Sequence, residues 1–380
     1  MKITMFGHKR VPSREGGVEI VVEELSARLA ALGHQVTCYN RGGHHVGGAG
    51  FDAKKIKEYR GIRLKTVPTL DKKGLAAVSS SFFAGFAAAF SSAKVVHIHA
   101  EGPAVMAWLP RLLGKRVIVT VHGLDWQREK WSKGFGAKYI RWGEKMAVKC
   151  AHEIIVLSQN VQNYFRDTYG RETVFIPNGV ARPENRQAQQ ITADYGLRKN
   201  GYILFLGRLV PEKGVHYLIE AFKSVKTDKK LVIAGSGSDT DEYAAKLKAL
   251  AQGDDRILFT GFVQGNPLEE LYSNAYLYVL PSDLEGMPLS LLEAMSYGNC
   301  CVTSDIAECA TVMEDRGVTF PKGNVDKLQL ALQELCDEPT KVSGYQAAAA
   351  DFICEKYNWD DVTKKTLELY QCKICLDLEL

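Results

Sequence analysis

Short runs of apolar, β-branched residues alternate with longer amphipathic segments along the first half of the chain. The runs predict strands at Ile3–Phe6, Val36–Tyr39, Ile62–Val67, Val95–Ile98, Val117–Val121, Ile154–Leu157 and Val174–Ile176. The amphipathic segments predict helices near 17–32, 75–92, 103–113, 134–150 and 159–168. This alternation is typical of a parallel sheet covered by helices, so we expect an α/β domain here.

The alternation restarts after a turn-rich stretch from Pro177 to Gly201, which we expect to be a linker. Strands are predicted at Tyr202–Leu206, Leu231–Ala234, Ile257–Thr260, Leu277–Leu280 and Cys301–Thr303. Helices are predicted near 214–225, 240–251 and 289–297, followed by two consecutive helices within 340–371. We therefore expect two doubly wound, Rossmann-like domains, residues 1–180 and 181–355, facing each other across a cleft. The helix within 356–380 is expected to pack back onto the first domain.

Charge is distributed unevenly between the two halves. The 380 residues carry 48 Lys+Arg and 44 Asp+Glu, but residues 1–180 hold 27 of the basic and only 14 of the acidic residues. The first half therefore favours an anionic surface or substrate. No basic stripe is interleaved with stacking aromatic residues, so a nucleic-acid interface is not expected.

Cysteine usage and the N-terminus bear on the compartment. Nine cysteines are too few for a disulfide scaffold, and no secretory leader is evident, so we expect reduced thiols and a cytoplasmic protein. The uncharged stretch 74–93 has the length of a membrane span, but its five serines and two glycines predict a buried or half-buried helix instead. Cys372 and Cys375 form a single C-x-x-C without a second pair, and their role stays open.

The first strand is not followed by the compact G-x-G-x-x-G turn of dinucleotide-binding domains, which argues against a dehydrogenase. Gly16 and Gly17 instead precede the helix near 17–32. Without a Cβ at Gly17, a phosphate can approach the helix N-terminus closely. The alternative is an ordinary loop that turns into a helix.

In the second half, FLGRLVPEKG places Arg208 and Lys213 in one loop after a strand. Two cations in such a loop can converge on a diphosphate and neutralise the charge that develops on a leaving nucleoside diphosphate. The alternative is a solvated loop.

The segment LPSDLEGMPLSLLEAMSYG, residues 280–298, places Glu285 before a helix and Glu293 within it. The backbone N–H groups of residues 289 and 290 have no acceptor inside the helix, and carboxylates beside them suit sugar hydroxyls. The alternative is that both glutamates merely stabilise the helix dipole.

The motifs GGVE, VVHIHA, TVHG, PNGV, GRLVPEKG, EGMPLSLLEAM and TSDI follow one another in this order. Together they resemble the retaining GT-B glycosyltransferases of glycosyltransferase family 4 over residues 1–371. The opening residues up to Arg41, with YRGIRLKTVPT, further resemble bacterial capsule and exopolysaccharide rhamnosyltransferases, which add L-rhamnose to a lipid-diphosphate-linked sugar. The resemblance implies a nucleotide-sugar donor, a lipid-linked saccharide acceptor, no cofactor and no dedicated metal.

The resemblance also implies roles for individual residues. Arg208 and Lys213 match the pair that holds the donor diphosphate, and Glu293 matches the carboxylate that binds the ribose. Glu285 and His122 match residues beside the transferred sugar. The implied catalytic residues are His122, Arg208, Lys213 and Glu285; the implied donor-binding residues are Gly17, Arg208, Lys213, Glu285, Met287, Pro288, Leu289, Ser290 and Glu293; and Arg14, Glu19 and His122 are expected on the acceptor side.

Three further groups resemble metal ligands. Asp239 and Asp241 form a D-x-D, which we interpret as helix-capping residues. The pairs His97 with His99 and His44 with His45 lack the additional ligands that zinc requires.

Residues 128–149 carry seven Lys/Arg and two acidic residues, with Trp126, Trp131, Tyr139 and Trp142 in or beside them. A basic, aromatic-flanked helix can lie on an anionic bilayer, so we expect a peripheral protein on the inner face of the cell membrane. The alternative is a solvated helix whose aromatic residues pack into the core.

The residues and the resemblance together predict transfer of a hexose or deoxyhexose, with L-rhamnose from dTDP-L-rhamnose as the specific hypothesis, in surface polysaccharide synthesis. A UDP- or GDP-sugar-dependent glucosyl, mannosyl or N-acetylglucosaminyl transferase is an alternative. A sugar-nucleotide epimerase of the same fold and a non-catalytic partner subunit also remain open.

Overall fold

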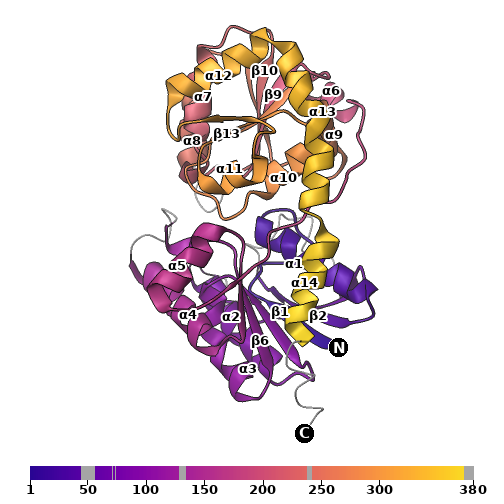
Figure 1. Cartoon of the computed structure of the whole chain (residues 1–380), viewed down its shortest axis with the longest axis vertical. Coiled ribbons are helices and arrows are strands. Elements are labelled where there is room, and N and C mark those ends of the chain that lie inside the picture. The colour runs from indigo at the N-terminus through magenta and orange to yellow at the C-terminus, as the bar shows by residue number, and fades with distance from the viewer. Residues whose placement is uncertain (44–55, 71, 73, 128–133, 238–241, 372–380) are drawn as a thin grey trace. The chain divides into compact units, whose positions relative to one another are not determined.

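The computed structural model describes the chain except for residues 44–55, 71, 73, 128–133, 238–241 and 372–380. The chain divides into two compact units, each built on its own sheet (Figure 1). The N-terminal unit comprises Met1–Asn178 and Trp359–Leu380, and the C-terminal unit comprises Gly179–Asn358.

The N-terminal unit has an eight-stranded sheet in the order β3-β4-β2-β1-β5-β6-β7-β8. All neighbouring strands are parallel except β3 and β4. The strands are β1 (Lys2–Phe6), β2 (Gln35–Arg41), β3 (Glu58–Tyr59), β4 (Ile62–Val67), β5 (Val95–His99), β6 (Arg116–Val121), β7 (Glu153–Val156) and β8 (Val174–Phe175). The central strands β5 and β6 are buried along their whole length, as continuous apolar runs in a parallel sheet require.

Helices cover both faces of this sheet. They are α1 (Gly17–Ala31), α2 (Leu75–Ala89), η1 (Gly102–Met106), α3 (Trp108–Leu112), η2 (Asp125–Gln127), α4 (Gly134–Cys150), α5 (Gln159–Tyr169) and α14 (Trp359–Gln371). Helices α1 and α14 pack together, whereas α2 to α5 contribute to one hydrophobic core with β5, β6 and β7. The structure divides the single helix expected near 103–113 into η1 and α3, because Pro110 has no N–H for a bond to the carbonyl of Met106.

The C-terminal unit has a six-stranded, fully parallel sheet in the order β11-β10-β9-β12-β13-β14. Its strands are β9 (Tyr202–Leu206), β10 (Lys230–Ala234), β11 (Ile257–Gly261), β12 (Leu277–Leu280), β13 (Cys301–Ser304) and β14 (Val318–Phe320). Its helices are α6 (Gln190–Tyr195), η4 (Pro211–Lys213), α7 (Val215–Lys223), α8 (Glu242–Leu250), α9 (Asn266–Asn274), α10 (Leu289–Ser296), α11 (Ala307–Met313), α12 (Val325–Asp337) and α13 (Pro339–Lys356). With two α/β units built on parallel sheets, the expected fold class is confirmed.

The stretch expected to be a linker contains the short helix α6. Its first turn is capped by a residue distant in sequence, because the Glu270 carboxylate accepts the N–H groups of Gln189 and Ile191, each at 3.0 Å. Gly196 ends the helix in the left-handed conformation. A tertiary cap of this kind gives no local sequence signal.

Helix α14 is attached to the N-terminal unit by polar contacts at both of its ends. Near its start, Arg28 Nε donates to Asp360 Oδ1 at 3.1 Å. Near its end, the buried Tyr370 hydroxyl lies 2.6 Å from His97 Nδ1, and His97 Nε2 lies 2.7 Å from Thr120 Oγ1. Burial lowers the pKa of His97 to about 3, so this ring is neutral and depends on Tyr370 and Thr120 for its hydrogen bonds.

Two buried carboxyl groups support the loop that follows β6. Glu101 Oε2 accepts the N–H of Asp125 at 2.9 Å, and Glu144 Oε2 accepts the indole N–H of Trp126 at 3.2 Å. Both glutamates are fully buried. Burial raises the pKa of Glu101 well above its usual value, and the neighbouring Asp125 and Glu144 raise it further.

Tyr370→Phe should lower the free energy of unfolding by about 1 to 3 kcal/mol, because it leaves Nδ1 of the buried His97 without its hydroxyl partner. Urea denaturation followed by circular dichroism measures this change. Tyr195→Phe, on a half-buried tyrosine of α6, is the control. An unchanged unfolding midpoint for Tyr370→Phe would contradict the proposed anchoring of α14.

Glu101→Gln should change how stability depends on pH. Because the pKa of Glu101 is raised in the native state, the unfolded chain releases this proton at a lower pH, and the contribution of Glu101 to stability falls as pH rises above its ordinary pKa of about 4.5. The glutamine variant has no such titration and should gain on the wild type between pH 5 and pH 8, as measured by thermal melting. Glu172→Gln, at an exposed glutamate, should show no such gain. A difference between Glu101→Gln and the wild type that stays constant with pH would show that Glu101 is ionised in the native state.

Candidate functional site

The order of strands in the C-terminal unit predicts where a ligand can bind. β9 lies between β10 and β12, so the chain leaves β9 toward one edge of the sheet and later returns to its other side. Open parallel sheets bind ligands at such a reversal, beside the carboxyl ends of the strands. The loops that follow β9 and β12 carry the predicted donor-binding residues Arg208, Lys213 and Glu285.

Two glycines hold the loop after β9 close to its neighbours. A Cβ at Gly235, after β10, would lie 1.8 Å from the carbonyl oxygen of Gly207. Gly214 has φ +64°, and a Cβ there would lie 2.0 Å from the carbonyl oxygen of Pro281. The backbone of the β9 loop is therefore pressed against the end of β12, and this contact fixes the position of Lys213.

Lys213 and Glu285 form an ion pair across these two loops. Lys213 Nζ lies 2.6 Å from Glu285 Oε1, and the side chains are only 14% and 8% exposed. The buried Ser282 hydroxyl donates to the same oxygen at 2.7 Å, and the N–H of Asp283 donates to the carbonyl of Glu212 at 2.8 Å. The predicted cation and the predicted carboxylate are thus brought into direct contact. Arg208, in the same loop as Lys213, is half-buried.

Helix α10 begins directly after this pair. Pro288 is its N-cap, and the carbonyl of Pro288 accepts the N–H groups of Leu291 and Leu292. The N–H groups of Leu289 and Ser290 precede the first intrahelical bonds and belong to the positive end of the helix. Met287 and Ser290 are half-buried, whereas Pro288 and Leu289 are buried.

Glu293 lies one turn further along α10 and is held by a tyrosine. The Tyr272 hydroxyl donates to Glu293 Oε2 at 3.1 Å, and the Tyr272 ring stacks on Tyr297 with centroids 5.3 Å apart. Burial raises the pKa of Tyr272 well above its usual value, and the Glu293 carboxylate contributes in the same direction. Tyr272 therefore remains a hydrogen-bond donor to Glu293.

In the N-terminal unit the strand order reverses between β1 and β5, and the glycine pair lies after β1. Gly16 is the N-cap of α1 and Gly17 is its first residue. Glu19 is buried and Oε1 accepts the N–H of Lys9 at 2.8 Å, so it closes the loop after β1. The guanidinium of Arg14 forms two ion pairs with α1: its Nη2 lies 3.7 Å from Glu23 Oε1 and 3.9 Å from Glu24 Oε1.

His122 lies immediately after β6 and is buried. Its Nε2 shares a hydrogen bond with Nδ1 of His99 at 3.1 Å. Burial and the neighbouring His97 lower the pKa of His99 well below its usual value, so the ring that orients His122 is neutral. Burial likewise lowers the pKa of His8, after β1, to about 4.

Several supporting residues were not predicted from the sequence. They are His99 beside His122, Glu101 and Glu144 beneath its loop, Ser282 beside Glu285 and Tyr272 beside Glu293. The alternation in VHIHA did signal that His97 and His99 share a face, but not that they pair with Tyr370 and His122. Among the residues that the structure describes, no cluster of three or more His, Cys, Asp or Glu side chains is arranged to hold a metal. Asp239, Asp241, His44, His45, Trp131, Cys372 and Cys375 lie outside the described residues.

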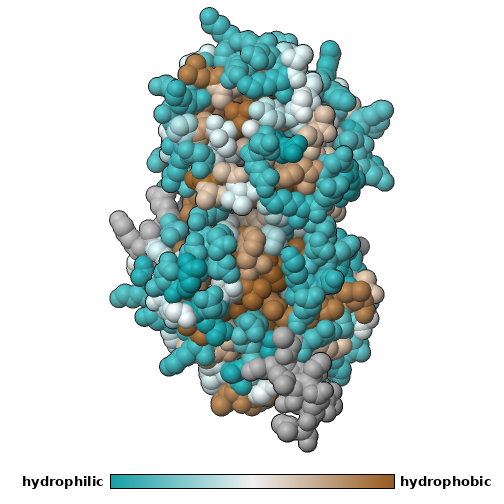
Figure 2. Space-filling view, in the orientation of Figure 1, coloured by the Kyte–Doolittle hydropathy of each residue, from teal (hydrophilic) through white to brown (hydrophobic). Residues whose placement is uncertain are grey.

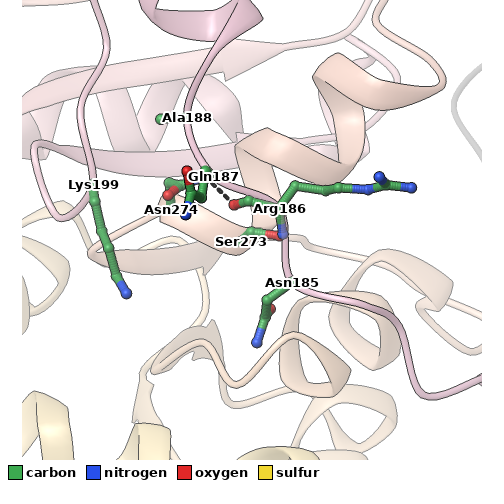
Figure 3. Close-up of a pocket in the computed structure, with 7 residues that line it drawn as sticks. All are labelled: Asn185, Arg186, Gln187, Ala188, Lys199, Ser273 and Asn274. Carbon is green, nitrogen blue, oxygen red and sulfur yellow. Dashed lines mark hydrogen bonds between the residues drawn. The ribbon is translucent and has the colours of Figure 1, made fainter.

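A pocket of the C-terminal unit lies away from these residues. Figure 3 shows its lining, which comes from residues 185–188, Lys199 and the end of α9. Asn274 donates to the carbonyl of Arg186 at 2.9 Å, and the Arg186 guanidinium donates to Glu269 at 2.9 Å. None of the predicted donor-binding residues lines the pocket.

Comparison with known proteins agrees with this architecture. Residues 15–182 match the family model described as Glycosyltransferase Family 4, and residues 200–338 match the one described as Glycosyl transferases group 1. An alpha-maltose-1-phosphate synthase of Mycolicibacterium smegmatis is 24% identical over 98% of this chain and 99% of its own length. A UDP-Gal:alpha-D-GlcNAc-diphosphoundecaprenol alpha-1,3-galactosyltransferase of Escherichia coli is 28% identical over 64% of this chain and 66% of its own length.

A solved structure, sucrose-phosphate synthase from Thermosynechococcus elongatus, superposes with a TM-score of 0.84 at 20% identity and covers 99% of both chains. This likeness shows a shared fold. The two family matches lie one in each half of the chain and between them take in both sheets. The chain is therefore a glycosyltransferase of the GT-B fold, composed of a family 4 domain and a group 1 domain.

Proposed function

We propose that this enzyme transfers a hexose or deoxyhexose from a nucleoside diphosphate to a lipid-diphosphate-linked saccharide in surface polysaccharide synthesis. The observation that carries the proposal is the contact between Lys213 and Glu285 at the strand reversal of the C-terminal unit, next to the N-terminus of α10. A cation, a carboxylate and free helix N–H groups at one place suit a sugar attached to a diphosphate.

The donor diphosphate would be bound by side chains of the C-terminal unit. Lys213 is already held in position, and Arg208 lies in the same loop, so both cations can neutralise charge as the sugar–phosphate bond breaks. Glu285 would then accept hydroxyls of the transferred sugar, and Glu293, fixed by Tyr272, would accept those of the ribose. We propose that no dedicated metal is needed.

The acceptor side is proposed for the N-terminal unit, with Arg14, Glu19 and His122, while Gly17 at the start of α1 is proposed to approach the donor phosphates. His122 is buried and oriented by a neutral histidine, which suits a hydrogen bond to a sugar hydroxyl. The galactosyltransferase relative acts, by its name, on a diphosphoundecaprenol-linked sugar, and this supports a lipid-linked acceptor here. The proposal therefore includes peripheral attachment to the inner face of the cell membrane through the basic helix α4.

L-Rhamnose from dTDP-L-rhamnose is the specific donor we propose, on the resemblance of the opening motifs to capsule and exopolysaccharide rhamnosyltransferases. A UDP- or GDP-sugar donor is the alternative, and the galactosyltransferase relative, named for UDP-Gal, favours testing it. An epimerase would alter the donor without an acceptor, and a non-catalytic subunit would leave it unchanged.

Incubation of the purified full chain with a lipid-diphosphate-linked sugar should give a product extended by one residue with dTDP-L-rhamnose. UDP- and GDP-sugars are tested in parallel, and mass spectrometry of the lipid fraction identifies the transferred sugar. Transfer from UDP- or GDP-sugars alone would refute the rhamnose assignment. If no donor is transferred and none binds in calorimetry, the proposed function is wrong.

Lys213→Ala should reduce kcat/KM for the donor by about 100-fold or more, because it removes a preorganised charge from the leaving diphosphate. Lys246→Ala, at an exposed lysine of α8, is the matched control and should retain wild-type kinetics. Circular dichroism of each variant checks folding. Equal kcat/KM values for the two variants would remove Lys213 from the site.

A further inference from the structure

Helix α2 exposes its largest apolar side chains and buries its small ones. The residues that it buries are Ser80, Ser81, Ala84, Gly85, Ala88 and Ala89. Four phenylalanines, Phe82, Phe83, Phe86 and its C-cap residue Phe90, are exposed, Phe90 to 71%. A surface helix in contact with water has the reverse arrangement, with polar residues outside and apolar residues in the core.

Close packing holds α2 in this orientation. A Cβ at Gly85 would lie 2.6 Å from Cβ of Met106 in η1, so only a small residue fits between the two elements. The hydroxyls of Ser80 and Ser81 both donate to the carbonyl of Ala77, at 3.1 and 2.6 Å, which satisfies them within the helix. Rotating the phenylalanines inward would break this contact and bring four large rings against η1.

The exposed rings form a continuous ridge. The ring centroids of Phe82 and Phe86 are 4.7 Å apart, and those of Phe86 and Phe90 are 6.3 Å apart. Helix α3, which packs on α2, adds Trp108, Leu112 and Leu113, with Leu112 exposed to 74%. Figure 2 shows apolar side chains at the surface of this unit, including the end where Figure 1 places α3. We call these seven residues of α2 and α3 the aromatic ridge.

The exposed charges of the segments that carry and follow the ridge are of one sign. Segments 75–115 and 134–150, which the structure describes completely, have only two acidic residues, and both of these, Glu101 and Glu144, are fully buried. The exposed charges of these segments are therefore all cationic: Lys94, Arg111, Lys138, Arg141, Lys145 and Lys149. A large apolar patch with a cationic border indicates a binding surface for an anionic, apolar partner.

We infer that the aromatic ridge inserts into the interfacial layer of an anionic bilayer, with the cations of α4 on the headgroups beside it. This inference rests on the proposed function for its biological purpose and extends it by naming the part of the chain that enters the lipid. None of the helices in the described part of the chain has the length and apolar content that crossing a bilayer requires. The ridge therefore lies in the interface without spanning the membrane.

A second copy of the chain fits this surface less well. A two-fold dimer would place the same face of each copy opposite the other, so the six exposed cations of one copy would meet those of its partner. An anionic lipid surface removes this repulsion and supplies the apolar layer that the phenylalanine rings lack in water.

Vesicle sedimentation with the full chain tests the inference. Wild-type protein should bind vesicles containing phosphatidylglycerol and should bind pure phosphatidylcholine vesicles much more weakly. The triple variant Phe82→Ser, Phe86→Ser, Phe90→Ser should lose about tenfold or more of its partitioning. Phe262→Ser, at an exposed phenylalanine of the C-terminal unit, is the matched control and should bind like wild type.

A second variant, Lys138→Gln with Lys145→Gln, removes charge without touching the ridge and should weaken binding to anionic vesicles only. Wild-type binding by the triple variant would overturn the inference, as would a wild-type dimer that the triple variant converts to monomer. Donor binding by calorimetry is measured on the same proteins. If the vesicle affinity depends on the ridge but no donor sugar is transferred, the proposed function is refuted and this inference stands. If sugar is transferred but the triple substitution leaves vesicle binding unchanged, this inference is refuted and the proposed function stands.

Discussion

A parallel sheet brings the carboxyl ends of all its strands to one edge, and the candidate chemistry of this enzyme depends on that constraint. In the C-terminal unit the strand reversal at β9 and β12 brings together loops that are about seventy residues apart in sequence, because Lys213 and Glu285 have a sequence separation of 72. In the N-terminal unit, adjacent strands β5 and β6 bring His99 to His122 in the same way. The sheet fixes the distances between these side chains, so that they can act on one ligand together.

Supporting contacts convert this placement into defined orientations. Gly214 allows the β9 loop to touch the end of β12, Ser282 fixes Glu285, and Tyr272 fixes Glu293. In the other unit, the buried Glu101 and Glu144 accept hydrogen bonds from the loop that begins at His122. Each of these carboxylates has at least one hydrogen-bond partner that sets its direction, which is how a binding site limits reorganisation on ligand arrival.

The strands that form the centres of the two sheets could be predicted from sequence because a strand buried on both faces must be apolar throughout. Tyr202–Leu206 and Leu277–Leu280, both at the centre of their sheet, have the predicted bounds. Ile62–Val67, next to the edge strand β3, also has its predicted bounds, although half of its residues are exposed. The two-residue strand β3 and the three-residue strand β14 were missed, since runs so short show little periodicity. The equally short β8 was found because Val174–Ile176 is a β-rich apolar run. Helix α6 was missed because its cap comes from Glu270, about eighty residues away.

In the candidate site, residues with a recognisable sequence motif could be predicted, whereas residues that matter only through tertiary contacts could not. Lys213, Glu285 and Glu293 were predicted from residue types and spacing, and the structure places them on adjacent loops and one helix, although their roles stay predictions. Glu101 and Glu144 look like ordinary surface acids in the sequence, and only tertiary burial makes them structural. The outward phenylalanines of α2 could not be predicted either, because an apolar helix gives no sign of which side meets the core.

The position of α14 has a consequence for biosynthesis. The first 178 residues form a sheet whose His97 depends on a hydroxyl at position 370, so the N-terminal unit lacks part of its core until residue 370 has been synthesised. During synthesis the N-terminal sheet therefore remains without α14 on one of its faces while the C-terminal unit is translated and folds. A truncation that removes Tyr370 would thus damage the N-terminal unit, although the cut lies more than 180 residues after Asn178 in the sequence.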